Sequence, residues 1–258
     1  MVETEVIQHS IEAFGKNAKL VLFFSVPFLL AFAIPLLSPM PTYISIGATF
    51  LRTGSMFIDL TYFDVGLIFI SSLASLFLIS FALVSINLVI KSQRTMTNIR
   101  TEVLEGIEKY TMTIFLLYTI TLVLSLAVLL LFHEYQLDDL ATPLFSFLVS
   151  LPLFYAPAAV VIDELRPLEA MKMSLFMIRR KLLLFVLWLL VGFILLSVID
   201  EIFILLPPVL RALMNSFGIA IDVNWGRYVV LVLNSMLVMP FLVILQTQSY
   251  LTKYTILK

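Results

Sequence analysis

The side chains of this chain that could take part in a reaction are carboxylates, histidines and hydroxyl groups. Their spacing argues against catalysis. Hydrolysis at a membrane needs paired carboxylates, a Ser/His/Asp set or a metal cluster. Asp163 and Glu164 are adjacent, as are Asp200 and Glu201. Adjacent side chains on a helix point about 100° apart and so do not converge on one substrate atom. Solvation of helix ends is the favoured interpretation of both pairs, and we expect a non-enzymatic protein without catalytic residues.

Composition restricts metal and cofactor chemistry. The chain has no cysteine and only two histidines, His9 and His133, which excludes disulfides, thiolate zinc sites, iron–sulfur clusters and thiol catalysis. His133 and Glu134, with Asp138 and Asp139, form an acidic turn whose oxygens suit a hard cation, but the glycine-shaped loop of a dedicated calcium site is missing. HExxH, GxSxG and phosphate-binding glycine loops are also missing. We therefore expect no metal site and no cofactor.

The elements that carry these residues belong in a bilayer. Of the 258 residues, 61% are hydrophobic and 13% are charged, whereas soluble domains are about 45–50% apolar and about 25% charged. A net charge of -1 provides no basic field for nucleic acid, so nucleic acid is not an expected partner.

Six apolar stretches are long enough for membrane-spanning helices, which need about 20 residues each. They cover 20–37, 65–90, 112–132, 143–162, 182–199 and 228–246. None shows the period-2 alternation of a membrane barrel strand. The sequence predicts an all-α, polytopic membrane helical bundle with six spans, forming one integral membrane domain over 1–258.

Basic residues fall almost entirely on one side of these spans. When the N-terminus is placed inside, 13 of the 16 Lys and Arg residues lie on the cytoplasmic side. Positively charged connections stay in the cytoplasm, so we expect a multi-pass protein of the cell membrane with both termini cytoplasmic. The outer connections are then 38–64, 133–142 and 200–227, and the first and last are long enough to fold onto the membrane.

A charged stretch with apolar residues at helical spacing precedes each odd-numbered span. All three stretches contain a branched aliphatic residue, a glutamate and a small residue in succession, centred on Glu12, Glu105 and Glu169. A lysine follows each glutamate at helical distance, as Lys109 follows Glu105, and such pairs stabilise exposed helices. We interpret the pattern as three repeats, each an interfacial helix plus a helical pair. Chance recurrence of a common tripeptide is the alternative.

The segment 152–181 has a distinctive order of features: a proline-broken span, an acidic pair at its cytoplasmic end, and a glutamate-containing helix that reaches a serine and a basic cluster. Its sequence is PLFYAPAAVVIDELRPLEAMKMSLFMIRRK, and the N-terminal SIEAFGKNAK follows the same scheme. On these residues, the chain resembles a family of six-span membrane proteins related to the membrane domain of bacterial glycerophosphodiester phosphodiesterases, with uncharacterised archaeal relatives. The resemblance implies a fold and a lipid-handling or scaffolding role. It does not imply phosphodiesterase catalysis, because the soluble catalytic domain has no counterpart in these residues.

No Lys, Arg, Asp or Glu lies inside a predicted span away from its ends. Ion-coupled carriers generally place ionisable groups at mid-membrane depth, so that class is disfavoured. Hydroxyl and amide groups remain inside the spans, and prolines interrupt the first, fourth and sixth of them. Small-residue faces are packing faces first. Any substrate cavity is expected between the second, fourth and sixth spans, near Ser75, Tyr155 and Asn234.

The densest run of charge directly precedes the fifth span. We interpret it as an anchor to anionic headgroups, worth about 1 kcal/mol per basic residue. Together with the three repeat glutamates, it defines the expected cytoplasmic interface. That interface holds Glu12, Glu105, Glu169, Arg179, Arg180 and Lys181.

Three classes of function remain to be compared. The favoured class is a lipid-handling or scaffolding protein that binds or moves lipid-like or hydrophobic substrates, with membrane lipids as partners. The alternative is the permease subunit of an ATP-driven exporter, whose partner is an ATPase or another membrane subunit. Six spans, a charged cytoplasmic helix and a membrane-dipping segment before the last span fit that plan. A membrane-embedded enzyme is the third class, and no constellation of residues supports it.

Overall fold

The computed structural model describes residues 2–37, 42–46, 49–53, 62–95, 99–135, 138–215 and 225–255. Long helices dominate these ranges, as the apolar stretches predict. The elements are α1 (Val2–Lys16), α2 (Ala18–Leu37), β1 (Thr42–Ile46), β2 (Thr49–Thr53), α3 (Tyr62–Thr95), α4 (Ile99–Glu134), α5 (Asp138–Phe154), α6 (Ala156–Asp163), α7 (Pro167–Arg180), α8 (Leu182–Asn215), α9 (Trp225–Leu233), the π-helix η1 (Asn234–Val238), α10 (Met239–Leu251) and the 3₁₀ helix η2 (Thr252–Thr255).

Five helical segments are long and apolar enough to cross a membrane on their own. They are Gly66–Gln93, Thr101–Val128, Ala141–Asp163, Leu182–Phe203 and Tyr228–Tyr254. A sixth is reached when α1 and α2, which meet at a bend of 92°, are taken as one broken span. The protein is thus a multi-pass helical membrane protein, with five or six spans in the described part of the chain.

The bend between α1 and α2 turns the chain into the helical bundle. Asn17 lies at the bend, and its side-chain amide donates to the carbonyl oxygen of Ala13 at 3.0 Å. Val6 and Ala13 are buried on the inner face of α1, which packs against α10, whereas Ile11 is exposed. This amphipathic helix has the geometry expected of the first charged stretch.

The second charged stretch differs from its prediction. Residues Ile99 to Glu134 form one unbroken helix, so the stretch is the first part of the third span's helix and not a separate interfacial helix. Its sequence contains no proline to end the helix. Its apolar face, with Val103 and Tyr110, is buried in the core, and α4 packs along α3. The third charged stretch is a separate helix, α7.

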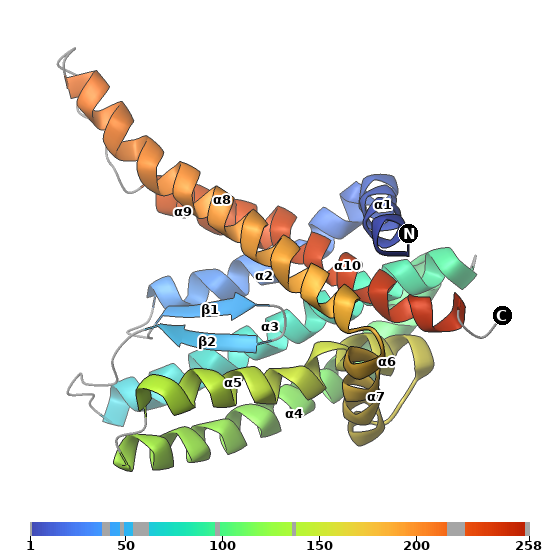
Figure 1. Cartoon of the computed structure of the whole chain (residues 1–258). Helices are drawn as coiled ribbons and strands as arrows, with labels where there is room; N and C mark the ends of the chain where they lie inside the picture. The colour runs from blue at the N-terminus through green and yellow to red at the C-terminus, as the bar shows by residue number, and fades with distance from the viewer. Residues whose placement is uncertain are drawn as a thin grey trace.

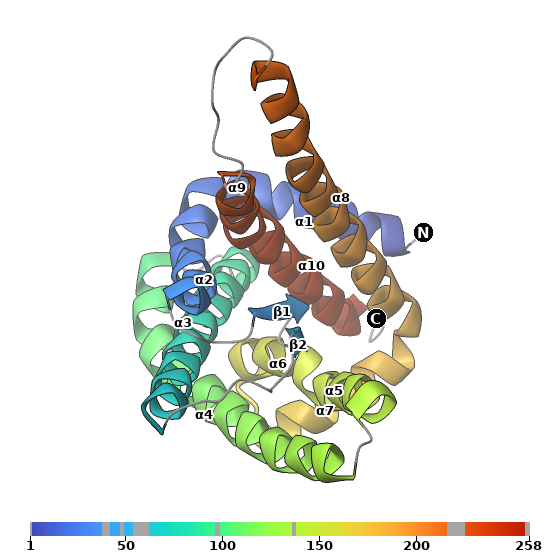
Figure 2. The same cartoon turned by 90° about the vertical axis from the view of Figure 1, so that its left-hand side faces the viewer.

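The first long connection contains an antiparallel hairpin that the sequence pattern did not predict. Thr42 lies opposite Thr53 and Ile46 opposite Thr49, and β2 packs against α5. Figures 1 and 2 place the hairpin beside α5, at the inner side of the surrounding helices. The all-α prediction therefore holds for every described segment able to cross the membrane, and the hairpin is the correction to it.

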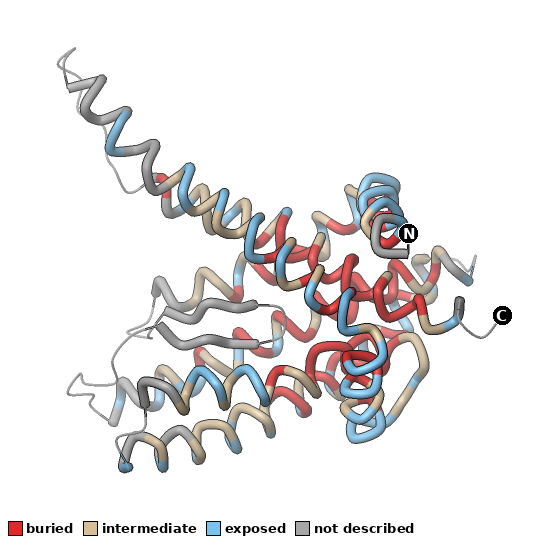
Figure 3. The backbone as a smooth tube through the Cα atoms, in the orientation of Figure 1, coloured by how far each residue is buried: buried red, intermediate tan, exposed pale blue. Residues whose placement is uncertain are grey.

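Packing is densest at the end of the bundle that holds both chain termini (Figure 1). The buried residues gather in this half, and few of the described residues toward the opposite end are buried (Figure 3). The inner faces of α3 and α10 supply much of this core, with Ile86, Leu88 and Ile244 fully buried. Toward the far end, α8 runs away from α4 and α5, as both views show. The terminal half therefore fixes the relative positions of the helices.

Candidate functional site

The fourth predicted span is broken in the structure, and a hydroxyl group from another helix fills the break. Tyr155 separates α5 from α6, with φ -90° and ψ -1°, and Pro157 follows in the first turn of α6. The backbone N–H of Tyr155 donates to Ser174 Oγ at 2.9 Å, and Ser174 Oγ donates to the carbonyl oxygen of Leu151 at 2.8 Å. Ser174 of α7 thereby satisfies two backbone groups that the break would leave unpaired.

Side chains from α8 and α10 complete the polar contacts around this break. Gln246 donates to the carbonyl oxygen of Phe154, and the Tyr155 hydroxyl lies 3.1 Å from Ser249 Oγ. The indole N–H of Trp188 donates to the carbonyl oxygen of Leu242 at 2.8 Å. These groups are buried, and each has a protein partner. The arrangement is typical of a structural network that fixes the helices.

The two carboxylates at the end of α6 point to opposite sides. Asp163 accepts hydrogen bonds from Tyr250, Lys253 and Tyr254, all in the C-terminal segment. The ammonium group of Lys253 also lies 4.4 Å from the centroid of the Tyr250 ring. Asp163 therefore binds α10 and η2, and it is not a solvated helix end as the sequence suggested.

Glu164 faces the other side, toward α3 and α4. Its backbone has φ 56°, in the left-handed region, where it ends α6; such a conformation costs a non-glycine residue about 1–3 kcal/mol. Its carboxylate lies 2.8 Å from Lys109 Nζ and 3.3 Å from Lys91 Nζ. The hydrogen bond from Lys109, with smaller contributions from Tyr110 and Lys91, lowers the pKa of Glu164 to about 2.

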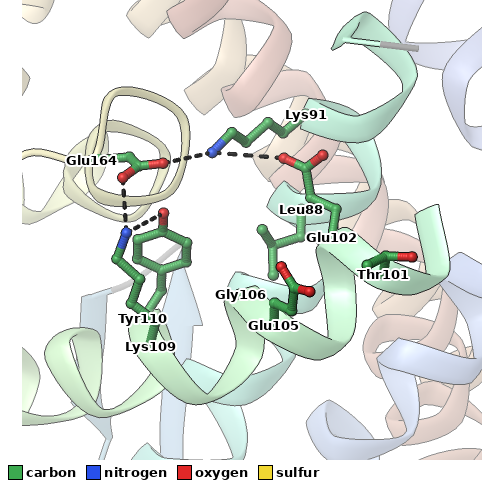
Figure 4. Close-up of a pocket in the computed structure, with 9 residues that line it drawn as sticks. All are labelled: Leu88, Lys91, Thr101, Glu102, Glu105, Gly106, Lys109, Tyr110 and Glu164. Atoms are coloured by element: carbon green, nitrogen blue, oxygen red, sulfur yellow. Dashed lines mark hydrogen bonds and ion pairs between the residues drawn. The ribbon is translucent and has the colours of Figure 1, made fainter. Parts of the chain in front are cut away.

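These charged residues surround an open pocket of about 500 Å³ between the end of α3, the start of α4 and the end of α6 (Figure 4). Leu88 and Gly106 form its apolar floor. A side chain at Gly106 would force Leu88 to shift, because a Cβ atom there would lie 2.7 Å from one methyl carbon of Leu88 and 2.8 Å from the other. The lining consists of Leu88, Lys91, Thr101, Glu102, Glu105, Gly106, Lys109, Tyr110 and Glu164.

Glu102 and Glu105 line the α4 side of the pocket in different ways. Glu102 lies 3.7 Å from Lys91 Nζ and so shares that lysine with Glu164. The predicted pairing of Glu105 with Lys109 is not what the structure shows, because Lys109 donates to Glu164 and to the Tyr110 hydroxyl. Within the described part of the chain, the Glu105 carboxylate has neither an ion-pair nor a hydrogen-bond partner.

The three residues predicted beside a substrate cavity have separate partners. Ser75 donates to the carbonyl oxygen of Ala31 in α2 at 3.2 Å. Tyr155 contacts Ser249, as described above. The side-chain amide of Asn234 donates to Asp200 at 3.2 Å. Each side chain thus joins neighbouring helices, and a cavity beside them stays a prediction.

The predicted interface residues take several local roles. Glu12 is exposed and accepts a hydrogen bond from Gln8 at 3.3 Å. Glu169 accepts a hydrogen bond from the backbone N–H of Arg166 at 3.4 Å and so caps the start of α7. Arg179 and Arg180 are exposed at the end of α7, and the backbone N–H of Lys181 donates to Met177 at 2.8 Å. Contact of these residues with headgroups stays a prediction.

The structure does not describe the side chains of the predicted acidic turn, which are His133, Glu134, Asp138 and Asp139. Elsewhere in the described chain, no three His, Asp or Glu side chains are close enough to hold a metal ion together.

Sequence reasoning missed Lys91, Glu102, Lys109 and Tyr110 as members of one site. A signal was available. Lys91 follows the second predicted span, Lys109 precedes the third, and Glu164 follows the fourth, so all three belong at the same side of the membrane. The spacing does not show which of these charges meet, because that depends on how α6 ends.

In comparisons with known protein families, curated proteins and solved structures, no match was found. The resemblance to the membrane domain of glycerophosphodiester phosphodiesterases therefore stays a prediction.

Proposed function

We propose that this protein is a non-enzymatic, lipid-handling or scaffolding protein of the cell membrane, which binds or moves lipid-like substrates. The pocket between α3, α4 and α6 holds the headgroup, on the cytoplasmic side together with both termini. The resemblance noted for residues 152–181 is consistent with this role, since Glu164 of that segment lines the pocket.

The observation that carries the proposal is the position of the pocket at the ends of candidate membrane spans. Lys91 lies near the end of the span Gly66–Gln93, and Thr101 begins the span Thr101–Val128. The pocket is therefore at the boundary between hydrocarbon and water, where lipid headgroups lie. Its volume of about 500 Å³ is within the range of small-molecule sites, about 300–1,000 Å³.

The surfaces beside the pocket suit acyl chains. Leu104, Met112 and Leu116 are exposed apolar residues of α4, next to the charged lining. A lipid that places its polar group among the charged residues can keep its chains against apolar side chains. A bare ion would gain nothing from that apolar surface.

Gentle purification followed by mass spectrometry of co-eluting lipids and proteins tests the proposal. The variant Thr101→Trp fills the pocket from an exposed position of α4, and Glu108→Trp places the same bulk on the same helix outside the lining. We expect lipid to be retained by the parent protein and by Glu108→Trp, and to be reduced severalfold in Thr101→Trp.

Equal lipid retention by the two tryptophan variants would contradict the pocket as the binding site. A protein that retains no lipid in any form would contradict the lipid-handling role. Co-purification of an ATPase in equal amount would favour the permease subunit of an ATP-driven exporter instead.

A further inference from the structure

The charges in the pocket are not equally available to a ligand. Lys91 is only 16% exposed and lies between Glu102 and Glu164, at 3.7 and 3.3 Å. Both carboxylates already neutralise this lysine. An anionic ligand would have to displace one of them to reach it.

Lys109 is more accessible but is also paired. Its ammonium group donates to Glu164 at 2.8 Å and to the Tyr110 hydroxyl at 3.2 Å, and its side chain is 60% exposed. A lysine ammonium has three N–H donors, so one donor remains for a ligand. A single phosphate oxygen can accept it without breaking the pair with Glu164.

Glu105 provides the uncompensated charge. The pocket is lined by two lysines and three glutamates, which leaves a net charge of one negative unit. Figure 4 shows Glu105 on the α4 wall, beside Gly106 and Leu88, while the dashed contacts join the other four charged side chains and Tyr110. The charge that a ligand meets without competition is therefore negative.

We infer that the pocket selects a headgroup that carries an ammonium group with N–H donors, bound by Glu105, and a phosphate that reaches the free donor of Lys109. The inference rests on the proposed function and names its substrate class. An ammonium group that meets a free carboxylate forms a charge-assisted hydrogen bond. An anionic headgroup without an amine would instead bring a second negative charge beside Glu105.

Titration of delipidated, detergent-solubilised protein with two lipids of equal chain length tests this inference by native mass spectrometry. Phosphatidylethanolamine carries the ammonium group and phosphatidylglycerol lacks it. We expect the parent to prefer phosphatidylethanolamine by about threefold to tenfold, as for one partly exposed charge pair. Glu105→Gln should lose this preference. Glu108→Gln, one turn along the same exposed helix surface and outside the lining, should keep it.

The outcomes separate the inference from the proposed function. If both lipids bind equally to the parent, or if Glu105→Gln keeps the preference, the ammonium site is wrong while lipid binding stands. If neither lipid binds but soluble phosphoethanolamine does so in a Glu105-dependent way, the ammonium site stands and the lipid-handling role is wrong. Absence of all binding contradicts both.

Discussion

At the scale of single residues, Gly106 sets how closely α3 and α4 approach. A Cβ atom at this position would meet both methyl carbons of the fully buried Leu88 at 2.7 and 2.8 Å. Alanine improves helix propensity by about 1 kcal/mol over glycine, but overpacking a core costs about 1–3 kcal/mol. We expect Gly106→Ala to lower the thermal unfolding midpoint in detergent.

Gly66 is the matched control for this prediction, since a Cβ atom there would meet nothing within 4 Å. Gly66→Ala should leave the midpoint unchanged or raise it slightly, because only the helix propensity changes. If the two alanine variants shift the midpoint equally, close packing at position 106 does not limit stability.

Glu164 links the stability of the fold to pH. The pKa of its carboxyl group falls from the ordinary 4.5 to about 2 in the folded protein, mainly because Lys109 donates a hydrogen bond to it. The ionised form therefore stabilises the fold above about pH 4.5, and this stabilisation is lost as the pH falls from 4.5 toward 2. We expect the midpoint of Glu164→Gln to fall less steeply over this range than that of the parent.

Unfolding midpoints between pH 7 and pH 3 measure the effect of Glu164. Glu108→Gln, which removes an exposed carboxylate with no described partner, should follow the parent curve. Parallel curves for the parent and Glu164→Gln would show that the contacts with Lys91 and Lys109 add no stability in solution.

At the scale of elements, the break between α5 and α6 depends on Ser174 of α7. This buried hydroxyl accepts from the N–H of Tyr155 and donates to the carbonyl of Leu151. Ser174→Ala leaves both backbone groups without these partners, and a buried unsatisfied polar group costs about 1–3 kcal/mol. We expect a clear loss of stability, measured as the unfolding midpoint.

Ser25→Ala is the control for Ser174→Ala, since Ser25 is equally buried but donates only to Val21 of its own helix, at 2.6 Å. That carbonyl lies in a regular helix, where a backbone N–H also serves it, so we expect a smaller effect. A Ser174→Ala protein as stable as Ser25→Ala would mean that the break is held by other contacts.

The apolar stretches predicted the elements well but not their connections. Hydropathy over about 20 residues reflects the cost of placing polar groups in hydrocarbon, and the described helices follow the predicted spans. By contrast, α4 continues without a break through Tyr110 because this part of it is buried against α3. The sequence pattern of one helix does not show which other helix will cover it. The threefold repeat was hard to predict for the same reason. The first and third charged stretches form separate helices, α1 and α7, whereas the second is the start of α4. The repeat therefore stays a prediction.

The pocket was harder to predict because it is made of contacts between distant residues. Lys91 and Lys109 meet Glu164 across sequence separations of 73 and 55 residues. Glu164 makes both contacts from the left-handed backbone conformation in which α6 ends. The sequence spacing favoured Glu105 as the partner of Lys109. In the structure Lys109 pairs with Glu164 instead, at 2.8 Å, and Glu105 has no partner among the described residues.

At the scale of the whole molecule, α6 ends near both chain termini (Figure 1), and charged side chains there join it to several other helices. Asp163 binds the C-terminal segment, and Glu164 binds α3 and α4. Two neighbouring carboxylates thereby join four helices at one end. The pocket lies beside Glu164, at this same end of the bundle.

For the proposed lipid site, the orientation of this end in the membrane determines which leaflet would supply the headgroup. Most lysines and arginines lie on the side of the termini, which favours a cytoplasmic position. The chain contains no cysteine, so single cysteines can be read without background. Tyr135 is exposed after α4, and Lys172 is exposed on α7. A membrane-impermeant thiol reagent on intact cells should label Tyr135→Cys and spare Lys172→Cys.

Permeabilised cells provide the control for this labelling, because both cysteines should then react. Labelling of Lys172→Cys alone in intact cells would place the termini outside. The pocket would then draw its headgroup from the outer leaflet, and the basic run 179–181 would lose its expected contact with the cytoplasmic surface, whose anionic lipids attract such residues. Labelling of Tyr135→Cys alone places the pocket among cytoplasmic headgroups, where Glu105 and Lys109 would bind an amine-containing lipid from the inner leaflet.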